Sequence, residues 1–291
     1  MNEAAAGGRP KPEAAGGPAR DRTIAADGAT LALGRRRLWE GLTFTVPRGE
    51  FLVVLGPNGA GKTSLLRVLL GLQRLTSGSV LIDGHSPRRG DAHIGYIAQY
   101  RAIDPDLPVL GRDLVGFGLD GHRWGPALRS HASAARIDGA LDLVGARSYA
   151  DAPVGRLSGG EQQRLRIAQA LVSGPALLLC DEPLQSLDLY YQRVVVEQIA
   201  DWNRRRGATV VFVTHDINPV LPVVNRVLLL ARRRWALGAV DEVLTAETLS
   251  RLYDAPVDVL RHAGRLVIVG ADLGAHEHET ALDGAGHHIH P

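Results

Sequence analysis

The sequence contains a single cysteine, few aromatic residues and no long apolar stretch. Because Cys180 has no partner, an internal disulfide is excluded, which is typical of a protein that works in a reducing compartment. No apolar run approaches the ~20 residues that a membrane-spanning helix requires. The formal net charge is only +2, so the composition gives no general positive surface for binding nucleic acid. These absences indicate a globular protein that binds neither nucleic acid nor lipid through bulk charge or hydrophobicity.

No signal peptide is expected at the start of the given sequence. Residues 1–21 lack the apolar middle of such a peptide, and their Ala, Gly and Pro content predicts a disordered tail. Three arginine runs, at 35–37, 204–206 and 232–234, stand between apolar segments and are interpreted as solvated turns. We therefore expect a cytosolic protein that reaches a membrane only through a partner.

The apolar segments predict an α/β fold with a mainly parallel sheet. Three of them are almost continuously hydrophobic, as expected for parallel strands that are buried on both faces. Helical patterns follow each one, and this alternation is typical of an α/β domain. The strands are expected at 50–56, 176–182 and 209–215, and the helices at 61–72, at 189–205 and, more weakly, at 217–225.

The other segments complete a predicted domain over residues 22–245. Two short strands with a polar turn are expected within 29–49, a mainly helical insertion over about 100–165, and a hairpin at 226–238. An extension with one helix and two strands is predicted over 246–270, followed by a flexible tail at 271–291.

The stretch GPNGAGKT at 56–63 fits the phosphate-loop pattern G-x-x-x-x-G-K-[ST], between a predicted strand and a predicted helix. Successive backbone amides of such a loop surround a β-phosphate. Lys62 is expected to contact the β- and γ-phosphates, and the Thr63 hydroxyl is expected to bind Mg²⁺. The sequence thus predicts a nucleotide site, for ATP, and a Mg²⁺ ligand in the hydroxyl of Thr63. The nucleotide site consists of Gly56, Pro57, Asn58, Gly59, Ala60, Gly61, Lys62, Thr63 and Ser64.

Further polar candidates follow other predicted strands. Asp181 and Glu182 end the apolar run at 176–182, and the carboxyl ends of parallel strands meet at one edge of a sheet. Asp181 is expected to hold Mg²⁺ and Glu182 to polarise the attacking water. Gln99 is a candidate for contacting the metal or the water. His215 is a candidate for contacting the γ-phosphate, although a histidine at a strand end also fits a structural role.

A second glycine-containing motif, LSGGEQQR at 157–164, opens a predicted helix. Together with the phosphate loop (Walker A), Gln99, LLLCDEP, SLD at 186–188 and THD at 214–216, it resembles the ATP-binding cassette (ABC) ATPases in order and spacing. The resemblance covers about 25–240. It implies a P-loop NTPase (RecA-like) core, an N-terminal antiparallel β subdomain, and a subunit that works as a head-to-tail homodimer.

The resemblance also implies roles for individual residues. Ser158, Gly159 and Gly160 would cover the γ-phosphate held by the partner's phosphate loop, in trans. Glu182 would be the general base, His215 would contact the γ-phosphate, Gln99 would link Mg²⁺ to the partner surface, and Asp188 would couple the two sites.

One position departs from the pattern of the ABC ATPases. Leu33 stands where these proteins usually carry an aromatic residue that stacks on adenine. Leucine offers apolar contact without stacking, a difference of about 1 kcal/mol. Nucleotide binding is expected to survive, with looser affinity or base preference.

The C-terminal part is similar to ATPase subunits of zinc and manganese importers, through HDINP-LP and LS-LY-APVDV. The resemblance implies separate transmembrane permease subunits, an extracytoplasmic binding protein that acts indirectly, and a position on the cytoplasmic face of the cell membrane. Import of another nutrient, such as an iron chelate or cobalamin, remains an alternative. A soluble cassette protein acting on nucleic acid or ribosomes is disfavoured by the charge. A small-molecule kinase would leave LSGGEQQR at 157–164, here called the signature motif, unexplained.

Histidines crowd the end of the chain. Neutral imidazoles at short spacing bind Zn²⁺ or Ni²⁺, which gives the hypothesis of a metal-sensing tail; a polar, disordered end is the alternative. The residues concerned are His276, His278, His287, His288 and His290.

Overall fold

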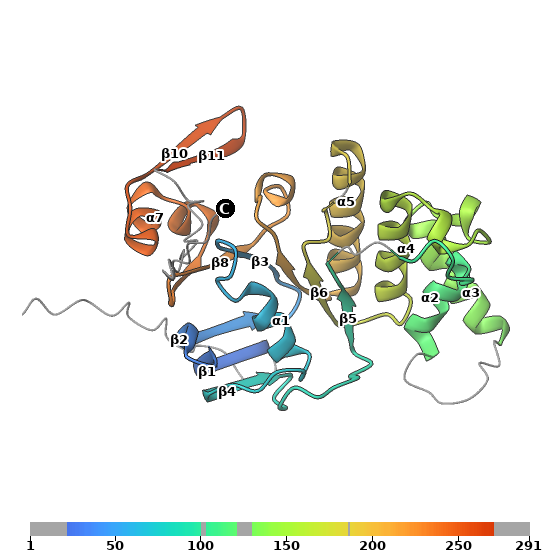
Figure 1. The fold of residues 1–291 in the computed structure, drawn as a ribbon, viewed down its shortest axis with the longest axis horizontal. Coiled ribbons are helices and arrows are strands. Elements are labelled where there is room, and N and C mark those ends of the chain that lie inside the picture. The colour runs from blue at the N-terminus through green and yellow to red at the C-terminus, as the bar shows by residue number, and fades with distance from the viewer. Residues whose placement is uncertain (1–21, 100–102, 121–129, 186, 271–291) are drawn as a thin grey trace, which may run out of the picture.

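The computed structural model describes residues 22–99, 103–120, 130–185 and 187–270. Within them, the strands form a six-stranded central sheet, a three-stranded antiparallel sheet and a two-stranded hairpin. Figure 1 shows helices α2, α3 and α4 gathered at one end of the molecule, and the β10–β11 hairpin at the other. The predicted tails at 1–21 and 271–291, with the five clustered histidines, lie outside the described residues.

The central sheet is mainly parallel, as the sequence predicts. Its strand order is β5-β6-β7-β3-β8-β9, and every pair is parallel except the edge pair β8–β9. All residues of the three central strands are buried, which explains their continuous hydrophobicity. The strands are β3 (Phe51–Leu55), β5 (Ile94–Ile97), β6 (Leu177–Asp181), β7 (Thr209–Val213), β8 (Arg226–Ala231) and β9 (Arg234–Gly238).

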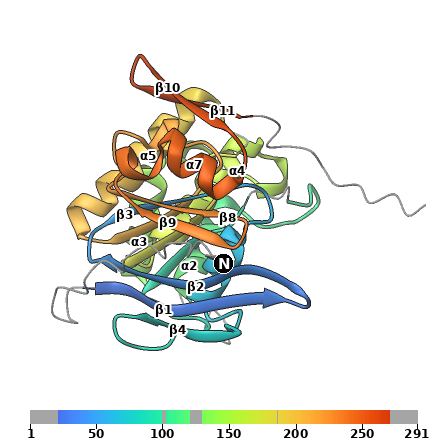
Figure 2. The same cartoon turned by 90° about the vertical axis from the view of Figure 1, so that its left-hand side faces the viewer.

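The antiparallel sheet consists of β1 (Arg22–Leu33), β2 (Arg36–Pro47) and β4 (Ser77–Ile82), in the order β2-β1-β4. It lies beside the β8–β9 edge of the central sheet, as Figure 2 shows. Both β1 and β2 are longer than the two short strands that the sequence predicts. The sequence did not predict β4 and β5, because they are short and their buried positions are too few to form a clear period.

The helices cover the central sheet and build the insertion. The stretch predicted to be helical contains α2, α3 and the start of α4, with two short 3₁₀ helices between α3 and α4. Helix α5 begins at the N-cap Asp188, whose side chain accepts from the Tyr191 amide, and ends at Gly207 with φ 59°. The ranges are α1 Lys62–Leu69, α2 Gly111–Asp120, α3 His131–Leu143, α4 Gly159–Leu171 and α5 Leu189–Arg206.

The weak helix expected at 217–225 is wrong. Only a 3₁₀ turn, Asn218–Val220, forms there. Pro222 has no amide hydrogen to donate and would remove a hydrogen bond from the interior of an α-helix over this range, whereas Pro219 lies in the first turn, where proline is tolerated.

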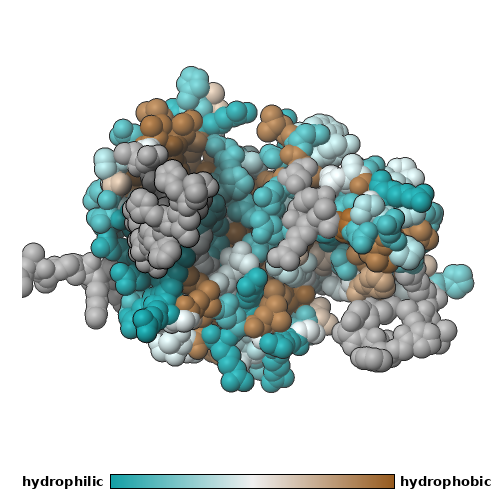
Figure 3. All heavy atoms as spheres, viewed as in Figure 1, coloured by the Kyte–Doolittle hydropathy of each residue, from teal (hydrophilic) through white to brown (hydrophobic). Residues whose placement is uncertain are grey.

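The chain after the central sheet contains the predicted helix and two strands: α6 (Val240–Val243) is followed by α7 (Ala246–Tyr253), β10 (Val257–His262) and β11 (Arg265–Gly270). Several apolar side chains of this hairpin are exposed, and Figure 3 shows the hydrophobic area they form. Among the described residues, no helix combines the length and apolar character that a bilayer crossing requires.

Candidate active site

The phosphate loop connects β3 to α1, and its glycines are required by close packing. Gly56, Gly59 and Gly61 have φ angles of 149°, 76° and 96°, which glycine adopts readily. A Cβ atom at Gly56 would lie 2.1 Å from the carbonyl oxygen of Leu230, and one at Gly61 would lie 2.8 Å from the indole nitrogen of Trp39. The loop is therefore held between the end of β8 and strand β2, in a conformation that only glycine permits.

Lys62, the first residue of α1, folds back over this loop. Its ammonium group donates to the carbonyl oxygens of Gly56 at 2.7 Å and Pro57 at 3.2 Å. Burial lowers the pKa of Lys62, and the neighbouring carboxylates Glu182 and Asp181 partly oppose this by raising it. A buried cation beside a helix N-terminus and a row of loop amides provides an arrangement that binds phosphate.

Thr63 and Asp181 meet at the edge of the sheet. The Thr63 hydroxyl donates to Asp181 Oδ1 at 3.1 Å, and the Tyr96 hydroxyl donates to Oδ2 at 3.4 Å. Asp181 is only 1% exposed, and this burial raises its pKa, with Glu182 raising it further against the two hydrogen bonds. A hydroxyl and one carboxylate fit Mg²⁺, which commonly takes one or two carboxylates and completes its shell with water and phosphate oxygens.

Glu182 and His215 lie together at the same edge. Glu182 Oε2 is 2.8 Å from His215 Nδ1, although the two residues follow different strands, β6 and β7. Glu182 has φ 50°, an unfavourable backbone conformation for a residue with a side chain, and its amide is held by the Val213 carbonyl oxygen at 3.0 Å. The strained turn directs a carboxylate, 14% exposed, towards the region of the phosphate loop.

Gln99 is placed near this group without joining Asp181. Its side-chain amide donates to Gln185 Oε1 at 3.2 Å, and among the described residues it makes no hydrogen bond to Thr63 or Asp181. The structure therefore brings Gln99 to the loop that follows Glu182, on the exposed side of the site.

The signature motif begins helix α4. Ser158 is its N-cap: the Ser158 hydroxyl accepts from the Glu161 amide, and the Glu161 carboxylate accepts from the Ser158 amide at 2.8 Å, forming a capping box. Gly159 and Gly160 form the first turn. Figure 1 shows α4 among the insertion helices, apart from α1 and its loop. Within one chain, the signature motif and the phosphate loop belong to separate parts of the described structure.

Two residues of the same motif have contacts that sequence reasoning did not identify. The side chain of Gln163 is fully buried and donates to the Pro183 carbonyl oxygen at 2.9 Å, next to Glu182. The guanidinium of Arg164 lies between the rings of Tyr149 and Tyr191, at 5.2 and 4.4 Å from their centroids. No local pattern indicated these partners, because they come from elements that are distant in sequence.

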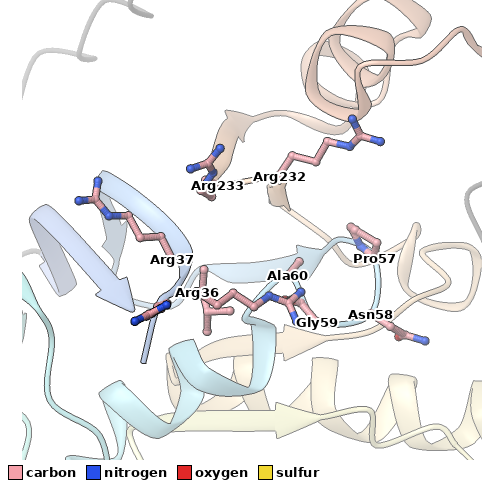
Figure 4. A pocket seen from close by; sticks show the side chains of 10 residues that line it. Arg36, Arg37, Pro57, Asn58, Gly59, Ala60, Arg232 and Arg233 are labelled. Carbon is pink, nitrogen blue, oxygen red and sulfur yellow. The ribbon is translucent and has the colours of Figure 1, made fainter. Parts of the chain in front are cut away.

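A cavity of about 570 Å³ lies beside the phosphate loop, as Figure 4 shows. Its walls are residues 35–38, 57–60 and 232–233, so two of the arginine runs interpreted as solvated turns line it. Leu33 is 51% exposed and is not among the lining residues. The sequence missed this cavity because the two runs become neighbours only through folding.

The chain is similar to known proteins over most of its length. A family model described as ABC transporter matches residues 39–185. The manganese transport system ATP-binding protein MntB of Bacillus subtilis is 32% identical over 81% of this chain and 94% of its own length. The zinc transport system ATP-binding protein TroB of Treponema pallidum is 34% identical over 79% of this chain and 86% of its length. The hemin import ATP-binding protein HmuV of Rhodococcus jostii is 34% identical over 86% and 85%.

Solved structures show the same likeness. A putative metal-chelate type ABC transporter in an inward-facing conformation aligns with a TM-score of 0.73 and 27% identity, over 87% of this chain and 98% of the other. The cbiO1 protein of Clostridium perfringens, part of the ABC transporter complex cbiONQ, aligns with a TM-score of 0.66 and 26% identity, over 79% and 94%.

Proposed function

We propose that this chain, which belongs to the ABC transporter family and is one of its ATP-hydrolysing subunits, drives the import of a divalent metal ion, zinc or manganese. ATP hydrolysis is supported by one observation: Lys62, the Thr63–Asp181 pair and the Glu182–His215 pair lie together at one edge of the sheet. The metal assignment is supported by relatives whose names state manganese or zinc transport.

The residues divide the chemistry among them. The loop amides and Lys62 bind the phosphates, with Lys62 exchanging its contacts to Gly56 and Pro57 for phosphate oxygens. Thr63 and Asp181 would hold Mg²⁺, which neutralises charge on the β- and γ-phosphate oxygens when bound. The oxygen donors and the buried charge of Asp181 fit this ion.

Glu182 would act as the general base. Its carboxylate accepts a proton from the attacking water, while His215 Nδ1, 2.8 Å away, keeps the carboxylate oriented. His215 is 68% exposed at the same edge, so its ring also stands where it can contact the γ-phosphate. Gln99, on the exposed side of the site, would link the bound Mg²⁺ to the surface of a partner subunit.

The site would be completed by a second copy. Ser158, Gly159 and Gly160 open a helix whose N-terminal amides favour a phosphate, and they stand apart from the phosphate loop of their own chain. A head-to-tail homodimer brings this helix end over the γ-phosphate of the other copy, with Asp188 at the start of α5 coupling the two sites. In this proposal, the dimer binds permease subunits at the cytoplasmic face of the membrane and an extracytoplasmic binding protein acts through the permease.

Within this proposal, residues 22–245 form the ATPase domain and 246–270 a C-terminal extension. Uptake of an iron compound is the second candidate, because the relatives include a hemin import protein at 34% identity. The metal-sensing hypothesis for the histidines of the tail remains a prediction, testable by deleting residues 274–291 and measuring inhibition by metal.

The test is ATP hydrolysis by the full chain reconstituted with its permease in lipid vesicles. The binding protein is supplied empty or loaded with Zn²⁺, Mn²⁺ or an iron chelate, and Lys62→Ala reports contaminating ATPase. We expect stimulation by Zn²⁺ or Mn²⁺. Stimulation by the iron chelate alone would overturn the metal assignment and keep the transport role, whereas hydrolysis equal to that of Lys62→Ala would overturn the ATPase role.

A further inference from the structure

The cavity beside the phosphate loop has a composition unlike an ordinary purine pocket. Five of its ten lining residues are arginines and none is aromatic. They come from two hairpin turns: Arg35 lies between β1 and β2, Arg36 and Arg37 begin β2, and residues 232–233 lie between β8 and β9. Figure 4 shows these turns facing the loop from different sides.

Only part of this positive charge is neutralised. Arg37 pairs with Glu40 at 2.5 Å, and Arg232 lies 3.6 Å from Asp254. No ion pair involves the other three arginines, Arg35, Arg36 and Arg233, within the part of the chain that the structure describes. The cavity therefore offers unneutralised guanidinium groups to an electron-rich ligand.

Arg36 is held against the phosphate loop. Its Nη2 donates to the carbonyl oxygen of Gly59 at 3.2 Å, and a Cβ atom added at Gly59 would approach Nη2 to 2.9 Å. One hydrogen bond occupies one of the five N–H donors of a guanidinium, so the planar face and the other donors stay available to a ligand.

The second turn adopts a costly conformation. Arg232 and Arg233 have φ angles of 44° and 68° and form the two-residue loop between the paired residues Ala231 and Arg234. Such loops strongly favour Asn-Gly, because both positions need positive φ. A bridge between Trp39 and Arg233 ties this turn to β2. Strain that persists at two adjacent arginines beside a binding loop is typical of a functional constraint.

We propose that this cavity holds the base and ribose of the bound nucleotide, that Arg36 contacts the base, and that guanine is accepted as readily as adenine. This rests on the nucleotide-binding role proposed above. The loop amides bind the phosphates, so the rest of the nucleotide must occupy space next to the loop, and the cavity shares residues 57–60 with it. Leu33 lies outside the lining and supplies no stacking face.

The base preference follows from the chemistry of guanidinium. Its face stacks on either purine, and its edge matches the O6 and N7 acceptors of guanine. Adenine offers the N7 acceptor but presents an amino donor in place of O6, which a group without acceptors cannot satisfy. An aromatic ring would stack on both bases without this edge contact, so arginine shifts the balance towards guanine.

The experiment measures binding of ATP, GTP and inorganic tripolyphosphate to the full chain by calorimetry with Mg²⁺. Wild type is compared with Arg36→Ala, Arg36→Lys and, as a matched control, Arg48→Ala. Arg48 follows β2 and pairs with Asp83 in an exposed position, and it does not line the cavity. Its substitution therefore removes one arginine charge, as Arg36→Ala does, without changing the cavity. Tripolyphosphate has no base and separates contacts to phosphate from contacts to the purine.

We expect wild type to bind ATP and GTP within about threefold of each other, because the edge contacts of guanine offset any preference for adenine. Arg36→Ala should weaken GTP about tenfold and ATP by less, because only guanine also loses the edge contact, and it should leave tripolyphosphate unchanged. Arg36→Lys should resemble Arg36→Ala, since lysine keeps the charge and loses the plane. Arg48→Ala should bind all three ligands like wild type.

Other results would overturn the proposal. GTP binding more than about tenfold weaker than ATP binding would refute the guanine contact. Equal losses for tripolyphosphate and nucleotides in Arg36→Ala would show that Arg36 binds phosphate, and full rescue by lysine would show that charge alone matters. If wild type binds none of the three ligands, the nucleotide-binding role itself is wrong. If wild type binds tripolyphosphate as tightly as ATP and GTP, the phosphate-binding role stands and the proposed contact to the base is wrong.

Discussion

Replacing Glu182 by glutamine tests the proposed hydrolysis mechanism most directly. The substitution keeps the size and the hydrogen-bonding oxygen of the side chain and removes its charge and its ability to accept a proton. In the structure, the carboxylate is 14% exposed and 2.8 Å from His215 Nδ1, so an amide oxygen can accept from that nitrogen in the same place. The geometry should therefore survive while the base is lost.

The expected magnitude follows from these contacts. A positioned general base contributes about 10²–10⁴ to the rate, so hydrolysis in Glu182→Gln should fall by that factor. ATP binding should persist, because Lys62 and the loop amides do not depend on this side chain for position. The Glu182 charge also raises the pKa of Asp181, and its removal brings that buried carboxyl closer to its usual value. Bound ATP that is not hydrolysed should trap the head-to-tail dimer.

The assay combines single-turnover hydrolysis, equilibrium ATP binding and size-exclusion chromatography with ATP and Mg²⁺. Glu197→Gln is the matched control, since Glu197 is exposed on α5 and the same charge is removed away from the site. A rate loss below about tenfold in Glu182→Gln would refute the assignment of the base, given the usual contribution of such a group. A variant that binds ATP and stays monomeric would refute the dimer.

Two further substitutions test other parts of the site. Ser158→Arg should bind ATP and hydrolyse it poorly, because the arginine blocks the contact to the partner's phosphate. Ser158→Ala is the control: it loses only the helix cap, about 1 kcal/mol of stability. Thermal unfolding of both variants shows whether the loss of hydrolysis in Ser158→Arg comes from misfolding. Asp181→Asn should be more stable than wild type without nucleotide at pH 7. Burial raises the pKa of Asp181, so the stability of wild type falls as the pH rises through that pKa. Urea unfolding should therefore show the stability difference between Asp181→Asn and wild type becoming smaller towards acid pH. A difference independent of pH would contradict this account.

Much of the fold could be predicted because its signals are local. The three central strands are buried on both faces, so their sequences are almost continuously hydrophobic. Each can therefore be identified from its own sequence, without knowing which strands it pairs with. The short strands β4 and β5 have too few buried residues to show a period and depend on neighbouring strands for their hydrogen bonds. The helix expected at 217–225 failed where prolines interrupt an otherwise apolar segment.

The candidate site divides in the same way. The phosphate loop is complete within 56–63, because glycine, lysine and threonine at that spacing already define a surface for phosphate. The sequence also placed Asp181, Glu182 and His215 at one edge, since parallel strands carry their carboxyl ends to the same side. The tertiary structure added the contacts between them, the hydroxyl of Thr63 on Asp181 and the imidazole of His215 on Glu182.

The arginine runs show what the sequence by itself determined and what it could not. Each run was interpreted as a solvated turn, because charge keeps such segments at the surface. Residues 204–206 instead form the last turn of helix α5, where Arg206 stacks on Trp202 at 4.9 Å. Residues 35–37 and 232–233 instead meet across a cavity beside the phosphate loop. Only tertiary structure decided this difference, because it depends on two sheets packing side by side, and no local pattern records which distant turn becomes a neighbour.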